Sequence, residues 1–247
     1  MLDPEIAQRI LALTTVYWET QIKNPGFMEL ATGKEIGQEI APYVDRQTTK
    51  LIADNFPTAR QHSPGGKIMS RSMGDIWVFS NGIYNPINVK AGEAGKNGQP
   101  NMVSLKKLLR ALLLHQLDSY YLLIVKMVLK GDIRPVVYLV DILDQLDYVT
   151  YDSGPGQIML KERQFYQTIE DKVKTIQLDP GGTGIFTTPT LPLDDKIAKL
   201  FEMLKDADRR LLANRNRVRA DIEEMEATYS AGRENPMNQS ALNLKPD

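Results

Sequence analysis

The chain has 247 residues, 42% of them hydrophobic and 25% charged, so it can bury the core of one large domain, with or without an appendage. The absence of cysteine excludes disulfides, thiol catalysis and thiolate zinc sites, and favours the reducing cytoplasm. Two histidines and a net charge of −1 argue against a histidine-rich metal site, a Ser/His triad and a passive basic DNA-coating protein. An enzyme that confines its positive charge to one cleft remains compatible.

Two parts of the sequence bear on secretion and membrane insertion: the N-terminus and the longest apolar run. The first residues, MLDPEIAQRILAL, carry early acids and no basic segment, unlike a signal peptide. The run LLIVKMVL is interrupted by Lys126 and is far shorter than the roughly 18 residues of a membrane-spanning helix. We therefore expect a cytoplasmic protein with no membrane association.

The N-terminal part predicts two amphipathic helices. Apolar residues recur at helical spacing over residues 4–24, and Asn24-Pro25-Gly26 ends that helix. A second helix opens at Thr32-Gly33 and carries an apolar face. Glu35 and Glu39 lie one turn apart on it.

The middle of the chain predicts a hairpin followed by a helix and more strands. A polar loop over 61–74 leads to a strand at 76–80, the turn Asn81-Gly82 and a return strand at 83–91. A glycine-rich loop over 92–101 precedes a leucine-rich helix from about Ser104, which we expect to continue through 120–129. Strands are expected at 135–143 and 148–152 and within 156–167, before a long loop at 179–192. These elements predict an α/β fold with a mixed central sheet flanked by helices.

The C-terminal part predicts one long charged helix over 194–229. Apolar residues seven apart resemble a heptad seam that needs a partner, either the chain's own domain or the same helix of a second copy. Asn214 could set the register of such a pair. The seam is formed by Ile197, Leu204, Leu211, Val218 and Met225. The expected organisation is a domain at 1–193, a helical extension at 194–230 and a disordered tail at 231–247.

Three residues of the predicted hairpin point to phosphodiester chemistry. Asp75 lies at the mouth of the first strand, and alternation puts Asn88 and Lys90 on one face of the return strand. A carboxylate can hold a Mg²⁺ ion, which prefers hard oxygen ligands, and a nearby lysine can stabilise charge that develops on a phosphate. Taken singly, Asp75 is also a common turn residue and Lys90 a common strand-edge residue.

The stretch from Arg71 to Ser104 resembles the catalytic core of type II restriction endonucleases of the PD-(D/E)xK nuclease superfamily. In that family an acid begins one strand and a (D/E)-x-K motif lies on the next; Asp75 matches the acid and Lys90 the lysine. A Pro-Asn-x-x-Ser loop, here Pro100 to Ser104, also occurs in several members. The sequence departs from the pattern at Asn88, where the family usually has an acid, and this puts a second metal ion in doubt.

The resemblance implies a restriction-endonuclease-like fold and Mg²⁺-dependent cleavage of double-stranded DNA at a short specific site by a homodimer. It implies that Asp75 and Asn88 hold the metal, that Lys90 polarises the phosphate or the water, and that Glu35 or Glu39 supplies a further carboxylate. The flanking loops offer DNA-binding candidates. Phosphate contacts are expected from Lys67 and Arg71, and weaker base or backbone contacts from Gln99, Asn101 and Ser104.

Two other interpretations stay open. One is a repair or recombination nuclease of the same superfamily that recognises DNA structure, and the other is a non-catalytic DNA-binding or helical assembly protein whose site has decayed at Asn88. A nucleotide cofactor is not expected, because Gly181-Gly182-Thr183-Gly184 lacks the Gly-Lys-Ser/Thr ending of a phosphate-binding loop.

Overall fold

The computed structural model describes residues 1–32, 36–61, 73–93, 101–128, 133–151, 156–160, 184–186 and 191–234. The chain divides into two compact units within its C-terminal helix: the first ends at Leu204 and the second begins at Lys205. The first unit is a mixed α/β domain, which confirms the predicted fold class. Among the described residues, no helix is both long and apolar enough to cross a membrane.

The centre of the first unit is a mixed sheet, in which the described residues form six strands. The pairs β3–β5 and β6–β9 are parallel and the other neighbours are antiparallel. In spatial order the strands are β1 (Ala59–Arg60), β2 (Ile76–Ser80), β3 (Ile83–Glu93), β5 (Tyr121–Val128), β6 (Arg134–Asp141) and β9 (Gly184–Phe186).

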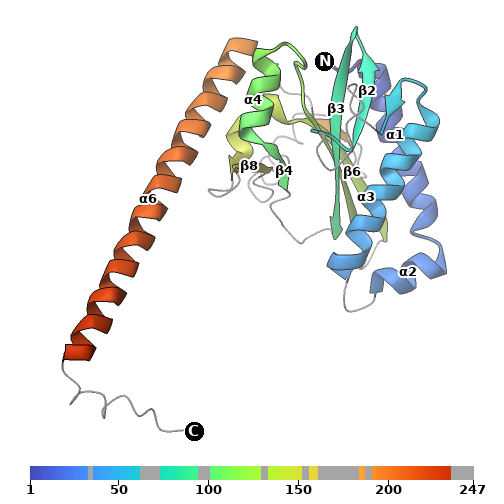
Figure 1. Ribbon diagram of the computed structural model, residues 1–247. Coiled ribbons are helices and arrows are strands. Elements are labelled where there is room, and N and C mark those ends of the chain that lie inside the picture. Colours follow the sequence, from blue (N-terminus) through green and yellow to red (C-terminus); the bar gives the residue numbers. More distant parts are fainter. Residues whose placement is uncertain are drawn as a thin grey trace. The chain divides into compact units, whose positions relative to one another are not determined.

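Helices cover one face of this sheet (Figure 1). They are α1 (Pro4–Gln21), α2 (Pro25–Thr32) and α3 (Ile36–Asn55). Buried residues of α1 and α3, such as Ile10 and Val44, share a hydrophobic core with Ile87 and Val89 of β3. The α3 helix packs on β3, and this contact brings its side chains to the strand that carries the predicted lysine.

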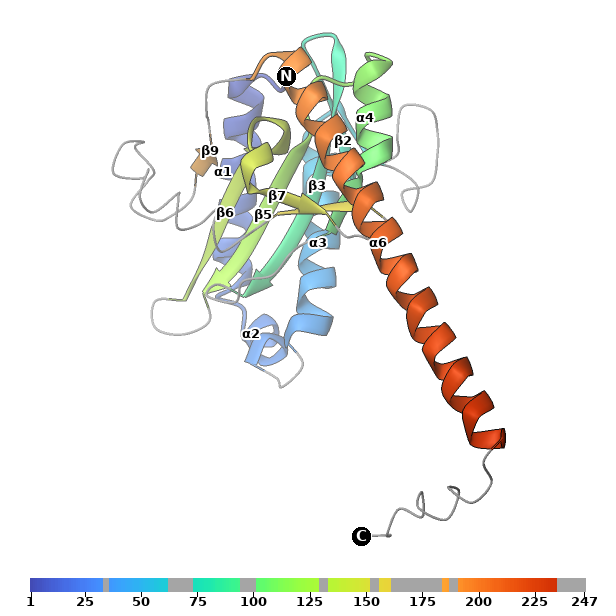
Figure 2. The ribbon, with the colours of Figure 1, turned by 90° about the vertical axis from the view of Figure 1, so that its left-hand side faces the viewer.

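The opposite face is covered by α4 (Leu105–Leu113) and a small antiparallel sheet, which lies in front of the main sheet in Figure 2. That sheet has the order β4–β8–β7, with β4 at Asn101–Ser104, β8 at Gln157–Leu160 and β7 at Val149–Tyr151. Two short 3-10 helices, η2 (Ile142–Asp144) and η3 (Leu146–Tyr148), link β6 to β7. Leu122 and Ile124 of β5 belong to the core on this side.

Three sequence-based expectations about elements were wrong or incomplete. Residues 121–128 form the strand β5, not a continuation of the preceding helix, because α4 ends at Leu113 and His115 adopts a left-handed conformation with φ 52°. A continuous apolar run is typical of both a buried helix and a central strand, and here both faces of the strand are buried. The expected loop at 179–192 contains the short strand β9.

The helix α2 was also not predicted. The Asn24-Pro25-Gly26 sequence that ends α1 begins this new helix, with Pro25 as its first residue. Asn24 accepts a hydrogen bond from the Gly26 N–H at 3.0 Å. A proline is favourable at the first helical position, where no intrahelical partner exists for its missing N–H.

The long C-terminal helix is confirmed as α6 (Leu193–Glu234). Its first turns belong to the first unit, where Leu200 is fully buried and Ile197, Met203 and Leu204 pack around it. From Lys205 onward the helix belongs to the second unit. For residues 193–204 the partner of the apolar seam is therefore the chain's own domain.

Candidate functional site

The candidate site lies where β3 extends beyond its neighbour β2. Ile76, the first residue of β2, pairs with Ile87, whereas β3 runs on to Glu93 and stays paired with β5 over that distance. The Asp75 N–H donates to the Ile87 carbonyl at 2.9 Å, so alternation turns the backbone groups of residues 87, 89 and 91 toward the β2 side. Past Ile87 these groups need partners other than a strand.

Asp75 supplies the first of these partners. Its Oδ2 accepts a hydrogen bond from the Val89 N–H at 2.7 Å. Gly74 allows this close approach, because a Cβ at that position would lie 3.0 Å from both the backbone nitrogen and the oxygen of Ile87. A larger residue at position 74 would clash with the Ile87 backbone, which explains the glycine directly before Asp75.

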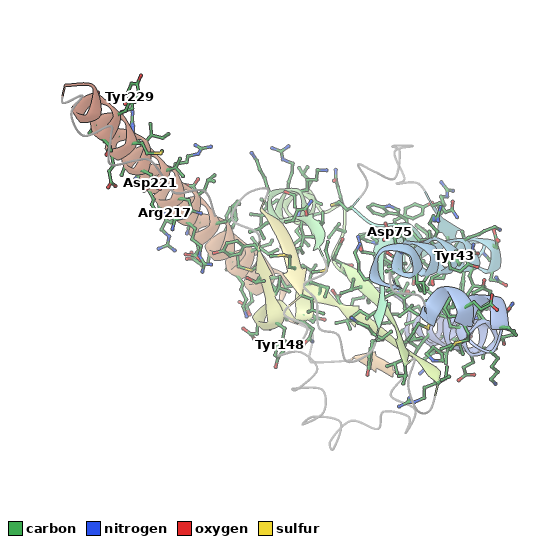
Figure 3. All side chains as sticks on the ribbon, turned by 90° about the horizontal axis from the view of Figure 1, so that it is seen from below. Tyr43, Asp75, Tyr148, Arg217, Asp221 and Tyr229 are labelled. Atoms are coloured by element: carbon green, nitrogen blue, oxygen red, sulfur yellow. The ribbon has the colours of Figure 1, made fainter. Side chains whose placement is uncertain are left out.

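Asp45 of α3 supplies the second partner. A hydrogen bond from the Ala91 backbone N–H favours its charged form, and the Lys90 charge does the same. Burial nevertheless outweighs both and, together with the Asp75 charge, raises the pKa of Asp45 to about 7. This edge of β3, which no described strand covers beyond Ile87, thus receives two carboxylates in succession. Figure 3 labels Asp75, which lies beside α3, the helix that also carries Tyr43.

Lys90 lies on β3 between Val89 and Ala91, the residues whose N–H groups bond Asp75 and Asp45. Burial raises the pKa of Asp75, and the Val89 N–H and the Lys90 charge lower it in part. Within the described part of the chain, no ion pair shorter than 4.0 Å joins Lys90 to Asp45 or Asp75. The lysine therefore acts on both carboxylates through space without being bound to either.

Asn88 shares the face of β3 that carries Lys90, and it is buried, with 7% of its surface exposed. Its side chain hydrogen-bonds the Tyr120 hydroxyl, and that hydroxyl donates to the Met73 carbonyl at 2.6 Å. Because the hydroxyl proton goes to Met73, the Asn88 amide N–H is the donor to Tyr120. The Asn88 Oδ1 atom has no hydrogen-bond partner in the described structure.

Tyr120 is completely buried beside this group. Burial raises the pKa of its hydroxyl well above the usual range, the Asp75 charge adds to this, and Asn88 opposes it. Tyr120 thus stays a neutral hydrogen-bonding group. It links the asparagine to Met73, two residues before Asp75 in the chain.

Sequence reasoning missed Asp45 and Tyr120. It sought the extra carboxylate at Glu35 or Glu39: Glu35 and the Glu39 side chain lie outside the described residues, while Asp45 occupies the next turns of the same helix. Asp45 directly follows the buried Val44 and precedes the buried Thr48 and Thr49, but the sequence alone does not show that this part of α3 packs on β3.

The predicted DNA-binding residues are placed only in part. Lys67, Arg71, Gln99 and the Asn101 side chain lie outside the described residues. Ser104 is the residue before α4 and caps it without a side-chain hydrogen bond. Its predicted role on DNA stays a prediction.

The polar atoms around β3 are of the kind that bind hard cations. Two buried oxygen atoms, Asp45 Oδ1 and Asn88 Oδ1, have no hydrogen-bond partner within the described residues, and buried polar atoms are normally satisfied. Both carboxylates have raised pKa values, which a positive ion would lower again. The set consists of two carboxylates and one amide; no cluster of three or more His, Cys, Asp or Glu side chains occurs among the described residues.

No protein-family model matches the chain, and no curated protein matches it.

Proposed function

We propose that this protein is a Mg²⁺-dependent endonuclease that hydrolyses phosphodiester bonds in double-stranded DNA at a short specific site, as a type II restriction endonuclease does. The observation that carries the proposal is the meeting of Asp75, Asp45 and Lys90 at the edge of β3 beyond Ile87. It joins an acid–lysine pair on adjacent strands to a carboxylate from an N-terminal helix, the arrangement that the family resemblance implies.

The residues present fit a hard divalent cation. Asp75, Asp45 and the Asn88 carbonyl oxygen would hold it, because Mg²⁺ prefers oxygen ligands and two of these residues carry an oxygen without a partner. When bound, the ion would polarise the phosphate and lower the pKa of the attacking water. The neutral Asn88 makes the site less negative than the family pattern and favours a single ion.

Lys90 would contact the substrate. Because it forms no ion pair with Asp45 or Asp75, its ammonium group is available for an oxygen of the scissile phosphate. There it would stabilise the negative charge that develops as the water attacks. The carboxylates of Asp45 and Asp75 would meanwhile hold the reacting groups in line.

Cleavage of both strands requires two such sites. We propose that the protein acts on double-stranded DNA as a homodimer, with one site for each strand, which suits a two-fold symmetric recognition sequence. The segments that flank the hairpin in the sequence, which carry Lys67, Arg71 and Gln99, would contact DNA phosphates and base edges.

The test is incubation of a plasmid with the purified chain in Mg²⁺, followed by mapping of the cut ends. The proposal expects discrete fragments with Mg²⁺ and DNA binding without cutting in Ca²⁺. Asp45→Asn should abolish cutting, whereas Asp54→Asn on the same helix should not, because Asp54 is exposed and pairs with Lys50. Cutting that survives Asp45→Asn would remove this site from the mechanism.

Two other outcomes would point to the alternatives. Cutting at junctions or flaps without a consensus sequence would favour a structure-specific nuclease. Tight DNA binding with no cutting in Mg²⁺ or Mn²⁺ would favour a non-catalytic protein whose site has decayed at Asn88.

A further inference from the structure

The second unit carries an apolar stripe on α6. Val218, Ile222, Met225 and Tyr229 follow a four-three-four spacing, which places them on one face of a helix. Each is between 45% and 66% exposed. With Leu211, which is one heptad before Val218, the stripe extends over about 27 Å of helix at 1.5 Å per residue. A contiguous apolar surface of this length favours a protein partner.

The charges on this part of the helix are separated into two blocks. The block at 209–219 contains five arginines and no acid, whereas the block at 221–226 contains four acids and no base. The basic block consists of Arg209, Arg210, Arg215, Arg217 and Arg219, and the acidic block of Asp221, Glu223, Glu224 and Glu226. Figure 3 labels Arg217 and Asp221, one from each block.

This separation goes beyond what an isolated helix needs. Local pairs do occur, since Arg219 lies 3.8 Å from Glu223 and Arg210 lies 2.9 Å from Asp206. A helix stabilised only by such pairs would interleave its charges along its length. Between residues 209 and 226 the sign changes only once, near residue 220, and the apolar stripe crosses that point.

We propose that α6 of a second copy of this chain covers the stripe in antiparallel orientation, crossing near residues 220–223. The antiparallel arrangement lays the basic block of each helix along the acidic block of the other, whereas the parallel one lays like charges together. In the register centred on residue 220, Val218 faces Ile222 of the second copy and Leu211 faces its Tyr229. The surface goes beyond the proposed nuclease function and does not depend on it.

The first test measures association of the full chain by sedimentation equilibrium. The wild type is expected to dimerise, and the dimer is expected to weaken about fivefold or more as NaCl rises from about 0.05 to 0.5 M, because opposite charges meet across the pair. Ile222→Asp should weaken the dimer at least about tenfold, since it puts a charge into the apolar stripe. Ala220→Asp is the matched control, because it adds the same charge on the opposite side of the helix.

The second test determines the orientation. The chain contains no cysteine, so Ala213→Cys and Ala220→Cys each give one labelled site, and the two positions are seven residues apart on the same outward face. In a parallel pair the spin-label distance within the dimer is the same for both variants. In the antiparallel pair the two labels at position 213 are offset along the axis by about 21 Å more than those at position 220.

Several results would overturn the proposal. They are a wild-type chain that stays monomeric at high micromolar concentration, a dimer that Ile222→Asp leaves intact, and equal label distances at positions 213 and 220. A dimer that strengthens with salt would likewise contradict the antiparallel pairing. None of these measurements uses cleavage, so the nuclease proposal can fail while this one holds, and the reverse.

Discussion

Two clusters in the first unit each combine one lysine with two aspartates, and they differ in what the lysine does. In one, Lys196 at the start of α6 forms a buried 2.7 Å ion pair with Asp144, and Asp141 lies beside them. In the other, Lys90 is bound to neither Asp45 nor Asp75. Each cluster leaves one carboxylate oxygen without a partner, so burial and charge alone do not distinguish them.

The hydrogen bonds of the Lys196 cluster show that it is structural. The Asp144 carboxylate joins two segments, because it accepts the Leu191 N–H at 3.1 Å as well as the Lys196 ammonium. Asp141 accepts the N–H groups of Tyr120 and Leu143 and thereby fixes the chain around η2. The Lys196 cluster thus holds the start of α6 to the domain, whereas no ion pair of that kind joins Lys90 to Asp45 or Asp75; the proposed function assigns the Lys90 cluster to a ligand.

The largest expected effect separates the clusters by activity. Asp75→Asn should lower the cleavage rate at least about 1,000-fold, because it removes a charged metal ligand while an amide oxygen can still accept the Val89 N–H. Asp144→Asn should leave the rate per folded molecule within about twofold. Single-turnover plasmid cleavage measures both, and equal losses in the two variants would contradict the assignment.

The second prediction concerns the free energy of unfolding, which should change more at the Lys196 cluster than at the Lys90 cluster. Lys196→Ala should lower the free energy of unfolding by about 3–5 kcal/mol, because it leaves a buried, unpaired carboxylate at Asp144. Lys90→Ala should cost about 1 kcal/mol or less, since no ion pair is broken. Urea denaturation followed by circular dichroism measures both.

The control for this prediction replaces both partners of the buried pair. Lys196→Met combined with Asp144→Leu should recover most of the lost stability, because a well-packed apolar pair is often as stable as a buried ion pair. A Lys90→Ala variant that is as unstable as Lys196→Ala would instead give Lys90 a structural role.

The third prediction uses pH and Mg²⁺. Burial, opposed by Lys196 and reinforced by Asp144, raises the pKa of Asp141 to about 7, the same value as that of Asp45. Between about pH 4 and 7 the folded chain holds protons that the unfolded chain has lost, so the free energy of unfolding falls as pH rises. A rise of about three pKa units corresponds to a fall of up to about 4 kcal/mol from each group, and no further fall from them is expected above the folded pKa.

Mg²⁺ should change the pH dependence of stability at one cluster only. Saturating Mg²⁺ should remove the part that belongs to Asp45, as Asp45→Asn does, and leave the part that belongs to Asp141. Denaturation at pH 5 and pH 8, with and without Mg²⁺, measures this. A pH dependence that Mg²⁺ leaves unchanged would argue that no cation binds at Asp45.

The sequence predicts more of the Lys90 cluster than of the Lys196 cluster. The Asp75–Asn88–Lys90 hairpin was predictable, because strand alternation and the Asn81-Gly82 turn define it locally. Asp45 was not, because its contact with β3 depends on how α3 lies on the sheet. Lys196 resembles an ordinary charged residue of an exposed helix, and only tertiary packing makes it a buried ion-pair partner.

The fold shows the same limit. Strands β2, β3 and β6 were predicted from β-branched and apolar patterns, and α6 from its length and charge. The strand β5 was taken for a helix, because a run buried on both faces carries no periodicity of two. That error hid Tyr120, the residue immediately before β5, and with it the partner of Asn88.

The smallest expected effect concerns Tyr120, the hydrogen-bond partner of Asn88, and is measured as a change in Mg²⁺ affinity. The Asn88 amide N–H bonds Tyr120, and Oδ1 has no hydrogen-bond partner among the described residues. If Oδ1 binds the proposed cation, Tyr120 is a positioning residue. Tyr120→Phe should weaken Mg²⁺ binding about fivefold, about 1 kcal/mol, as measured by titration calorimetry without DNA. Asn88→Asp should tighten binding, because it adds a charged ligand.

In the Asn88→Ala background, Tyr120→Phe should have no further effect on Mg²⁺ affinity, since the group that it positions is gone. Equal losses in both backgrounds would mean that Tyr120 supports the fold near Met73 without orienting Asn88.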